Sequence, residues 1–159
     1  MFPGSHELLV QQNQELDRAQ AFRVINDFDL VQLGAASDPQ LDGALDLRGK
    51  TSVRQAAAVL SQSRLFIGLV SGLMHLARAV DCRSVIVFGG REHPFQSGYS
   101  ANENLHWEGP CSPCWLRNEC DFDRVCMSDI LPEAVIAAAR RQLDRYGTPL
   151  ATERAEIAG

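Results

Sequence analysis

Residues 65–80 read LFIGLVSGLMHLARAV, and this stretch decides the fold. The continuous apolar run from Leu65 to Ile67, which ends at Gly68, is typical of a strand buried on both faces of a parallel sheet. After Ser71 the apolar spacing becomes that of one face of an amphipathic helix, with apolar residues at Leu73, Leu76, Ala77 and Val80. The stretch therefore predicts a strand, a tight turn at Ser71-Gly72 and a helix.

Two further apolar runs predict two more buried strands. They span Leu30 to Leu33 and Val85 to Phe88, and a glycine follows each of them directly. Ser52 and Gln55 have the spacing of a capping box, and the helical apolar pattern that begins there falls on Val53, Ala56, Ala57 and Leu60. The alternation of strands and helices implies right-handed crossovers. We therefore expect an α/β fold with a Rossmann-like, doubly wound parallel sheet.

Two flanking segments are predicted to be helical. Loosely helical apolar spacing predicts a helix over about Glu7 to Asn26. Near the other end, Pro132 opens a helix that is predicted to run through Tyr146, and Gly147 ends it.

The remaining sequence is expected to form loops. The stretch from Gly89 to Pro110 is rich in Gly, Pro, Ser and Asn, and it predicts a long loop with one strand at Asn104 to Trp107. A cysteine-rich loop follows at 109–127. We expect a single domain over residues 1–147, and a flexible tail at 148–159.

The composition excludes several classes of protein. The 159 residues are 45% hydrophobic and 22% charged, with a formal net charge of -5, as in ordinary globular domains. Lys and Arg do not collect in blocks, so no nucleic-acid-binding surface is expected. No apolar run approaches the roughly 18 residues of a membrane span, and the opening residues lack the pattern of a signal peptide. We therefore expect a cytoplasmic protein with no transmembrane segment.

The turn in the middle of the quoted stretch is the first candidate site. It is expected at the carboxyl edge of the sheet, where open α/β folds bind ligands. With Ser71 at the helix N-cap, the backbone N–H groups of Gly72, Leu73 and Met74 are expected to point outward at the positive end of the helix dipole. His75 stands four residues after Ser71, on the same helix face. These residues predict a phosphate site to which the imidazole adds a hydrogen bond.

A simpler interpretation of the same residues stays open. In it, Ser71 only caps its helix and His75 is a partly exposed surface residue, since helix caps and lone histidines are common. Asp38 lies just past a predicted strand and could contact a ligand, but turn chemistry favours a structural role. Arg91 could reach a phosphate from its loop, and the alternative for Arg91 and His93 is ordinary solvated charge.

Three motifs stand in a definite order along the chain. They are Gly49-Lys50-Thr51-Ser52 at a helix start, Ser71-Gly72 with His75 and Ala77 after a strand, and Phe88-Gly89 at the end of the next strand. Together with CSPC at 111–114 and CMSDI at 126–130, this order resembles glycosyltransferase family 9, which contains the ADP-heptose:lipopolysaccharide heptosyltransferases. The resemblance extends from about Leu30 to Leu143.

The resemblance implies one half of the two-domain arrangement called GT-B, and the chain looks like the C-terminal, donor-binding half. It implies that Ser71, Gly72 and His75 lie against the diphosphate and sugar of a nucleotide-sugar donor such as ADP-heptose. The segment Gly89-Gly90-Arg91 is expected to border the same cleft. Transfer to a glycan or lipopolysaccharide-type acceptor then needs an N-terminal acceptor-binding half or a protein partner. A position at the periphery of the inner membrane fits such an acceptor.

Two departures from the family pattern leave a second interpretation open. Val70 stands where the family has an acidic residue that is positioned for the donor sugar. The acceptor-binding half is not among these 159 residues, and no catalytic base is identified in them. Since transfer requires both substrates to be oriented together, the alternative is a non-catalytic nucleotide-sugar-binding module or partner subunit with a degenerate site.

Four of the five cysteines lie close together in the sequence, at Cys111, Cys114, Cys120 and Cys126. A C-x2-C pair is the usual first half of a structural zinc site, and four thiolates can enclose Zn²⁺ tetrahedrally. Reduced thiols, or disulfides that stiffen the loop, are the alternatives, and a metal-stabilised structural domain is a third interpretation of the chain. No other cofactor is expected. The fifth cysteine, Cys82, is expected to be a small buried side chain.

Overall fold

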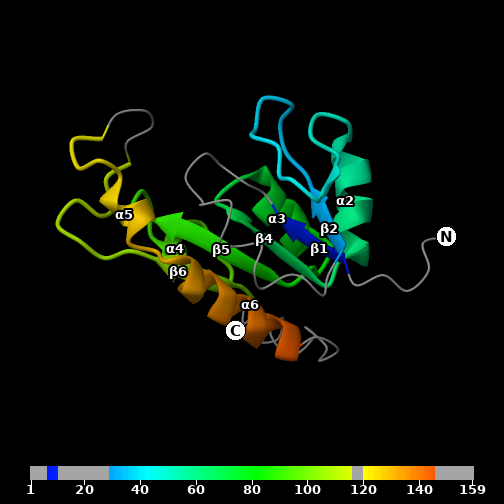
Figure 1. Cartoon of the computed structure of the whole chain (residues 1–159). Helices are drawn as coiled ribbons and strands as arrows, with labels where there is room; N and C mark the ends of the chain where they lie inside the picture. Colours follow the sequence, from blue (N-terminus) through cyan, green and yellow to red (C-terminus); the bar gives the residue numbers. More distant parts are fainter. Residues whose placement is uncertain (1–6, 11–28, 116–119, 146–159) are drawn as a thin grey trace.

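The computed structural model describes residues 7–10, 29–115 and 120–145. The strands in this part of the chain form one parallel sheet, in the order β3-β2-β1-β4-β5-β6 (Figure 1). They are β1 (Glu7–Val10), β2 (Asp29–Gln32), β3 (Leu45–Asp46), β4 (Leu65–Leu69), β5 (Ser84–Gly89) and β6 (Glu103–His106). This order is that of the Rossmann fold, in which the chain reverses its direction across the sheet between the first and fourth strands. The predicted α/β class with a doubly wound parallel sheet is therefore confirmed.

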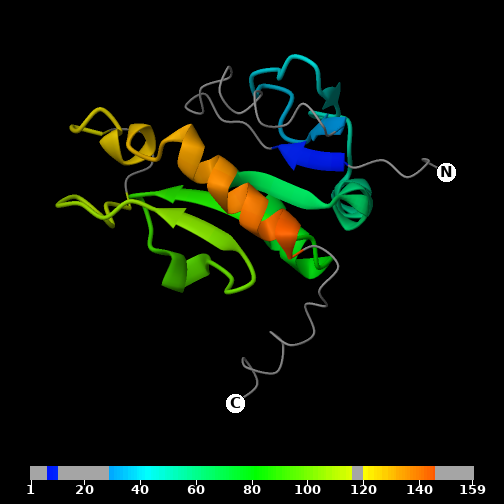
Figure 2. The ribbon, with the colours of Figure 1, turned by 60° about the horizontal axis from the view of Figure 1, so that its bottom comes forward.

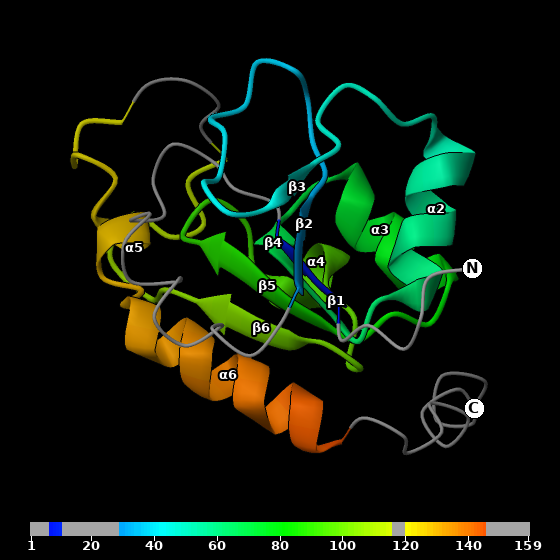
Figure 3. The same ribbon diagram turned by 45° about the vertical axis from the view of Figure 1, so that its right-hand side comes forward.

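Helices cover both faces of this sheet. α2 (Val53–Gln62) and α3 (Gly72–Ala79) lie side by side on one face (Figure 3). α6 (Pro132–Asp144) lies across the other face (Figure 2). Two short helices, α4 (Pro94–Ser97) and α5 (Val125–Ser128), belong to the connections that follow β5 and β6. Within the described residues, no helix combines the length and the apolar character that a membrane crossing requires.

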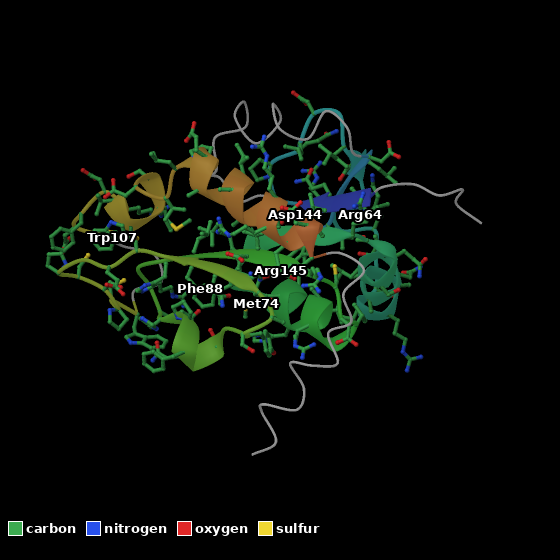
Figure 4. All side chains as sticks on the ribbon, turned by 90° about the horizontal axis from the view of Figure 1, so that it is seen from below. Arg64, Met74, Phe88, Trp107, Asp144 and Arg145 are labelled. Carbon is green, nitrogen blue, oxygen red and sulfur yellow. The ribbon has the colours of Figure 1, made fainter. Side chains whose placement is uncertain are left out.

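The central strands are buried on both faces, as their continuous apolar runs predict. In β4, Leu65 and Ile67 belong to the core that includes residues of α6, whereas Phe66 belongs to the core that includes residues of α2 and α3. β5 alternates in the same way, and Figure 4 shows its Phe88 on the same side of the sheet as Met74 of α3. Because successive side chains of a strand point to opposite faces, an unbroken apolar run supplies both cores at once.

The N-terminal prediction is wrong where it can be compared. Glu7–Val10 is not the start of a helix but a strand, and it pairs with β2 on one side and β4 on the other. The sequence ELLV is a short apolar run of the kind that marks the other strands, and the helical spacing comes only from later residues. The remainder of the predicted helix, to Asn26, lies outside the described residues.

The C-terminal half of the chain agrees with the predictions in its main elements. α6 begins at the predicted Pro132 and ends at Asp144, while Tyr146 and the predicted tail at 148–159 lie outside the described residues. The expected strand in the long loop is present as β6, one residue earlier than predicted. The two-residue β3 and the four-residue helices α4 and α5 are too short to give a periodic signal, and they were not predicted.

Candidate functional site

The candidate site lies at the switch point of the sheet. β1 and β4 are neighbours there, with β2 and β3 on one side and β5 and β6 on the other. The chain leaves β4 at Leu69 and enters α3 at Gly72, with Ser71 as an extended N-cap residue (φ -161°, ψ 175°). In open α/β sheets, ligands bind outside the carboxyl ends of the strands at this point. The turn is therefore where the fold favours a ligand.

An open cavity of about 620 Å³ lies beside this turn. Three segments line it: the end of β2 and the residues after it, the start of α2, and the first two turns of α3. The lining residues are Leu33, Gly34, Ala35, Thr51, Ser52, Val53, Ala56, Ser71, Gly72, Leu73, His75, Leu76 and Ala79. Both helices thus begin at the cavity, and both N-caps, Ser52 and Ser71, are part of its wall.

The two helix N-termini differ in how their amides are satisfied. α2 closes its own first turn, because Gln55 Oε1 accepts a hydrogen bond from Ser52 N (2.9 Å) and Ser52 Oγ accepts one from Gln55 N (3.4 Å). In α3, the Ser71 side chain makes no such capping bond. The N-terminus of α3 therefore has more capacity than that of α2 to bind an anion.

Gly72 gives a ligand direct access to the first turn of α3. The residue is exposed, and a Cβ built on it would meet no atom within 4 Å. The N–H of Met74 donates to the carbonyl of Ser71 (3.1 Å), which is the first hydrogen bond of the helix. The amides of Gly72 and Leu73 come before it in the chain. Two backbone donors, not three, are thus presented at this end.

Met74 differs from the prediction in a second respect. Its side chain is fully buried, in the core between the sheet and the pair α2 and α3. Its N–H is used in the tight first turn of α3, so the expectation of an outward-pointing donor at Met74 is wrong. The structure brings Ser71, Gly72, Leu73 and His75 together at the cavity, and it leaves Met74 out.

His75 is exposed, lines the cavity and has a defined orientation. Its Nδ1 lies 2.8 Å from the hydroxyl of Tyr99, and the two rings meet edge-on with their centroids 5.7 Å apart. Since Tyr99 engages Nδ1, Nε2 is the nitrogen that a ligand would meet. Tyr99 is 24 residues further along the chain, so no local sequence pattern connects it with His75.

Gly89, Gly90 and Arg91 do not line this cavity. A Cβ on Gly89 would lie 2.5 Å from Met127 Sδ, and one on Gly90 would lie 2.9 Å from Cys126 Cβ, so both glycines are closely packed against α5. The carbonyls of Gly90 and Arg91 accept hydrogen bonds from the amides of Cys114 (3.2 Å) and Trp115 (3.0 Å). In this structure the segment anchors the cysteine-rich loop, and none of its three residues is among those that line the cavity beside Ser71.

The cysteines are all free thiols, so the disulfide alternative is not realised in the structure. Among the described residues, the sulfur atoms of Cys111, Cys114, Cys120 and Cys126 do not form a group of metal-ligand atoms within 4.8 Å of one another. Cys82 is buried, as predicted, and burial raises the pKa of its thiol to about 12.

The loop after β2 forms one wall of the cavity through a network of polar contacts. Asp38 Oδ2 accepts a hydrogen bond from Ala35 N (2.8 Å), and Gly49 N donates to Gly34 O (2.9 Å). Asp38 thus shapes the wall rather than contacting the cavity, which agrees with the structural role favoured from its turn position.

The same loop is closed by Arg48, which sequence reasoning did not single out. Arg48 Nε donates to Asp46 Oδ1 (2.8 Å), its Nη1 donates to the Asp38 carbonyl, and Lys50 Nζ donates to Asp46 Oδ2 (3.1 Å). The hydrogen bonds from Arg48, and then that from Lys50, hold the pKa of Asp46 well below its usual range. The available signal was a charged residue at every second position, with one acidic residue at 46 and basic residues at 48 and 50.

A Rossmann-type sheet with an accessible helix N-terminus at its switch point is an arrangement in which α/β domains commonly bind phosphorylated ligands. A model of glycosyltransferase family 9 (heptosyltransferase) matches residues 29–125, which is more than half of the chain. The chain belongs to this family.

Relatives and solved structures agree with this assignment. The chain is 32% identical over 111 residues to lipopolysaccharide heptosyltransferase 3 of Escherichia coli (strain K12). The matched region covers 70% of this chain and 32% of that protein. Its fold matches that of the dodecameric iron-containing heptosyltransferase TibC, of enterotoxigenic E. coli, in complex with ADP-D-beta-D-heptose (TM-score 0.76, 16% identity, 89% of this chain and 46% of that one). It also matches E. coli ADP-heptose lps heptosyltransferase II (TM-score 0.70, 15% identity, 91% and 48%).

These coverages define how much of a family member is present. The chain spans about a third of the length of the curated relative and just under half of each solved structure. Its Rossmann-like sheet is therefore the fold of one half of a GT-B heptosyltransferase.

Proposed function

We propose that this chain is the donor-binding half of a heptosyltransferase-type glycosyltransferase. It binds a nucleotide sugar of the ADP-heptose kind, for transfer of the sugar to a glycan or lipopolysaccharide-type acceptor. The proposal rests on one observation: the amides of Gly72 and Leu73, with His75 beside them, open onto a cavity at the switch point. The TibC complex with ADP-D-beta-D-heptose supports the choice of donor.

The diphosphate of the donor binds at the first turn of α3. The two leading amides donate hydrogen bonds to phosphate oxygens, and the aligned peptide dipoles of the helix favour negative charge there. Gly72 allows the phosphate to approach the backbone, since no side chain stands in the way. During transfer, the same groups stabilise the charge that develops on the departing diphosphate, and such electrostatic stabilisation is a large part of catalysis.

His75 adds a side-chain donor to this site. Tyr99 engages Nδ1, so Nε2 is directed to a phosphate oxygen or to a hydroxyl of the sugar next to it. The rest of the cavity wall is largely apolar, with Leu33, Val53 and Leu76 among its residues. Apolar walls with few polar groups are usual for nucleotide-sized ligands. We assign this part of the cavity to the nucleobase of the donor.

The reaction also needs groups that the cavity does not contain. Among the described residues that line it, none carries a carboxylate, and His75 supplies the one imidazole. Val70, where the family has an acidic residue, is partly buried and packs against the core on the side of α2 and α3. We therefore assign the catalytic base and the acceptor site to an N-terminal half or partner protein.

The four clustered cysteines carry no step of this mechanism. TibC is described as an iron-containing heptosyltransferase, and the four clustered cysteines of this chain were predicted to bind a structural metal. Their sulfur atoms are not gathered into a ligand set here, so the thiols as placed do not fit a four-thiolate site. We derive no step from them.

Calorimetric titration of the 159-residue chain with ADP-heptose tests the proposal. We expect saturable binding that His75→Gln weakens by about tenfold, since a charge-assisted hydrogen bond contributes roughly 1.5 kcal/mol. Arg54→Gln, which removes a positive charge from an exposed position of α2 outside the cavity, is the matched control and leaves the affinity unchanged. Absence of binding, or equal losses in both variants, would contradict the proposal. Transfer measured after an acceptor-binding half is added separates an enzyme subunit from a non-catalytic binding module.

A further inference from the structure

A second group of ligand-forming side chains lies apart from the donor cavity. His93, His106 and Glu108 each offer one atom, and these three atoms lie within 4.8 Å of one another. His93 is the N-cap of α4, His106 is the last residue of β6, and Glu108 follows two positions later. The rings of the two histidines are close, with their centroids 4.3 Å apart and their planes inclined by 59°.

The protein already orients both imidazoles. Nδ1 of His93 accepts a hydrogen bond from the N–H of Phe95 (3.3 Å), which leaves Nε2 to bind an ion. Nε2 of His106 lies 3.4 Å from Ser112 Oγ, whereas its Nδ1 lies 4.0 Å from Glu108 Oε1 and faces the carboxylate. In metal sites, the second ring nitrogen is usually held by a protein group, which fixes the ring and its tautomer.

We propose that His93, His106 and Glu108 bind a divalent transition-metal ion, with Zn²⁺ as its representative. Two imidazole nitrogens and one carboxylate oxygen are the donor set of three-ligand zinc sites, and they favour a transition metal over Mg²⁺ or Ca²⁺. Zinc lies about 2.0–2.2 Å from such ligands, so the three atoms draw closer on binding. Glu108 provides this movement, because its side chain is 84% exposed while that of His106 is 10% exposed.

The ion would connect three segments of the chain. His93 belongs to the connection between β5 and β6, His106 pairs with Gly89 across the sheet, and Ser112 belongs to the cysteine-rich loop. Tyr99, which orients His75, is in the same connection as His93 and follows α4 by two residues. The bound metal therefore stabilises the connection that carries Tyr99, without entering the donor cavity.

Titration of the metal-free 159-residue chain with Zn²⁺ and Co²⁺ tests the site, with its thiols kept reduced. Because cysteines also bind both ions, the Co²⁺ absorption spectrum separates the sites: thiolate ligands give sulfur-to-cobalt charge transfer, and imidazole and carboxylate ligands do not. We expect one ion to bind per chain, and its Co²⁺ spectrum to lack the sulfur-to-cobalt charge-transfer band (the sulfur band). Loss of an outer-sphere partner lowers metal affinity by up to about 100-fold. His106→Gln and His93→Asn remove direct ligands, so they lower the affinity for this ion at least about 100-fold. Glu108→Gln lowers it less.

The variants are chosen so that misfolding does not obscure the result. Asn is a favourable N-cap, so His93→Asn retains the cap of α4, and Glu108→Gln changes an exposed side chain. His75→Gln removes a histidine outside the cluster and leaves the ion bound. Equal metal stoichiometry and affinity in the parent, His93→Asn and Glu108→Gln would overturn the proposal, as would Co²⁺ binding only with the sulfur band. If His106→Gln unfolds, the other two variants decide the question.

Discussion

The hydroxyl of Tyr99 lies 2.8 Å from Nδ1 of His75, and this contact joins the connection between β5 and β6 to the first turns of α3. The tyrosine ring also meets the imidazole edge-on, and the guanidinium of Arg78 lies 6.0 Å from the centre of the same ring. Tyr99 is therefore a positioning residue: it has no place in the cavity wall, and it acts through the orientation of His75.

Removal of the Tyr99 hydroxyl tests this relationship. Tyr99→Phe retains the ring contact and loses one hydrogen bond, which contributes about 1 kcal/mol. We expect an approximately fivefold loss of ADP-heptose affinity by calorimetry, with a change in unfolding free energy of less than about 1 kcal/mol. Phe95→Leu, at an 80% exposed position of α4, is the control and changes neither quantity. An unchanged affinity in Tyr99→Phe would show that Tyr99 does not position His75 for the donor.

A side chain at Gly72 should block the donor without unfolding the protein. A Cβ there meets no atom within 4 Å, so Gly72→Val changes the unfolding free energy by no more than about 1 kcal/mol. The isopropyl group occupies the approach to the first amides of α3, and we expect at least a tenfold loss of donor affinity. Gly98→Ala is the opposite case, since its Cβ would lie 2.5 Å from the Pro94 carbonyl oxygen. It costs about 1–3 kcal/mol in urea unfolding.

Much of the fold follows from patterns that are local in the sequence. The strands β4 and β5 were predicted because both faces of each are buried and their runs are unbroken. α2 and α3 were predicted from their apolar spacing and N-caps. The strand at Glu7–Val10 was missed because four residues carry too little pattern against the helical spacing that follows.

The candidate site was predictable only in part, because only some of its residues belong to a pattern that is local in the sequence. Ser71, Gly72, Leu73 and His75 occupy one helix start, so strand and helix periodicity together place them. Tyr99 depends on a tertiary contact between distant segments. The close packing of Gly89 and Gly90 against α5 depends on how the cysteine-rich loop returns to the sheet, which no spacing within one segment encodes.

Cys82 should be the least reactive of the cysteines. It is 5% exposed and its pKa is raised to about 12 by burial, so almost no thiolate is present at pH 8. The other four cysteines are partly exposed. We expect iodoacetamide at pH 8 to modify those four while Cys82 reacts only after denaturation, as measured by peptide mass spectrometry. Rapid modification of Cys82 in the native chain would contradict its placement in the core.

Acidification should weaken the loop that forms the cavity wall. The pKa of Asp46 is lowered, chiefly by hydrogen bonds from Arg48, so the stabilisation is present above the ordinary carboxyl pKa and is lost as the pH falls toward the lower folded value. We expect Asp46→Asn to lower the thermal midpoint at pH 7, with the difference from the parent shrinking below pH 4. Asp42→Asn, at an exposed position of the same loop, serves as the control. A difference that stays constant with pH would contradict the role of the Asp46 charge.

The amide signals of the first turn of α3 provide the most direct test of the whole account. Titration of the ¹⁵N-labelled chain with ADP, followed by two-dimensional NMR, reports which backbone N–H groups meet the diphosphate. The account predicts the largest shifts at Gly72 and Leu73, with Gly89 and Gly90 unmoved. Shifts concentrated at Gly89 and Gly90, or none at Gly72 and Leu73 when ADP saturates, would contradict it.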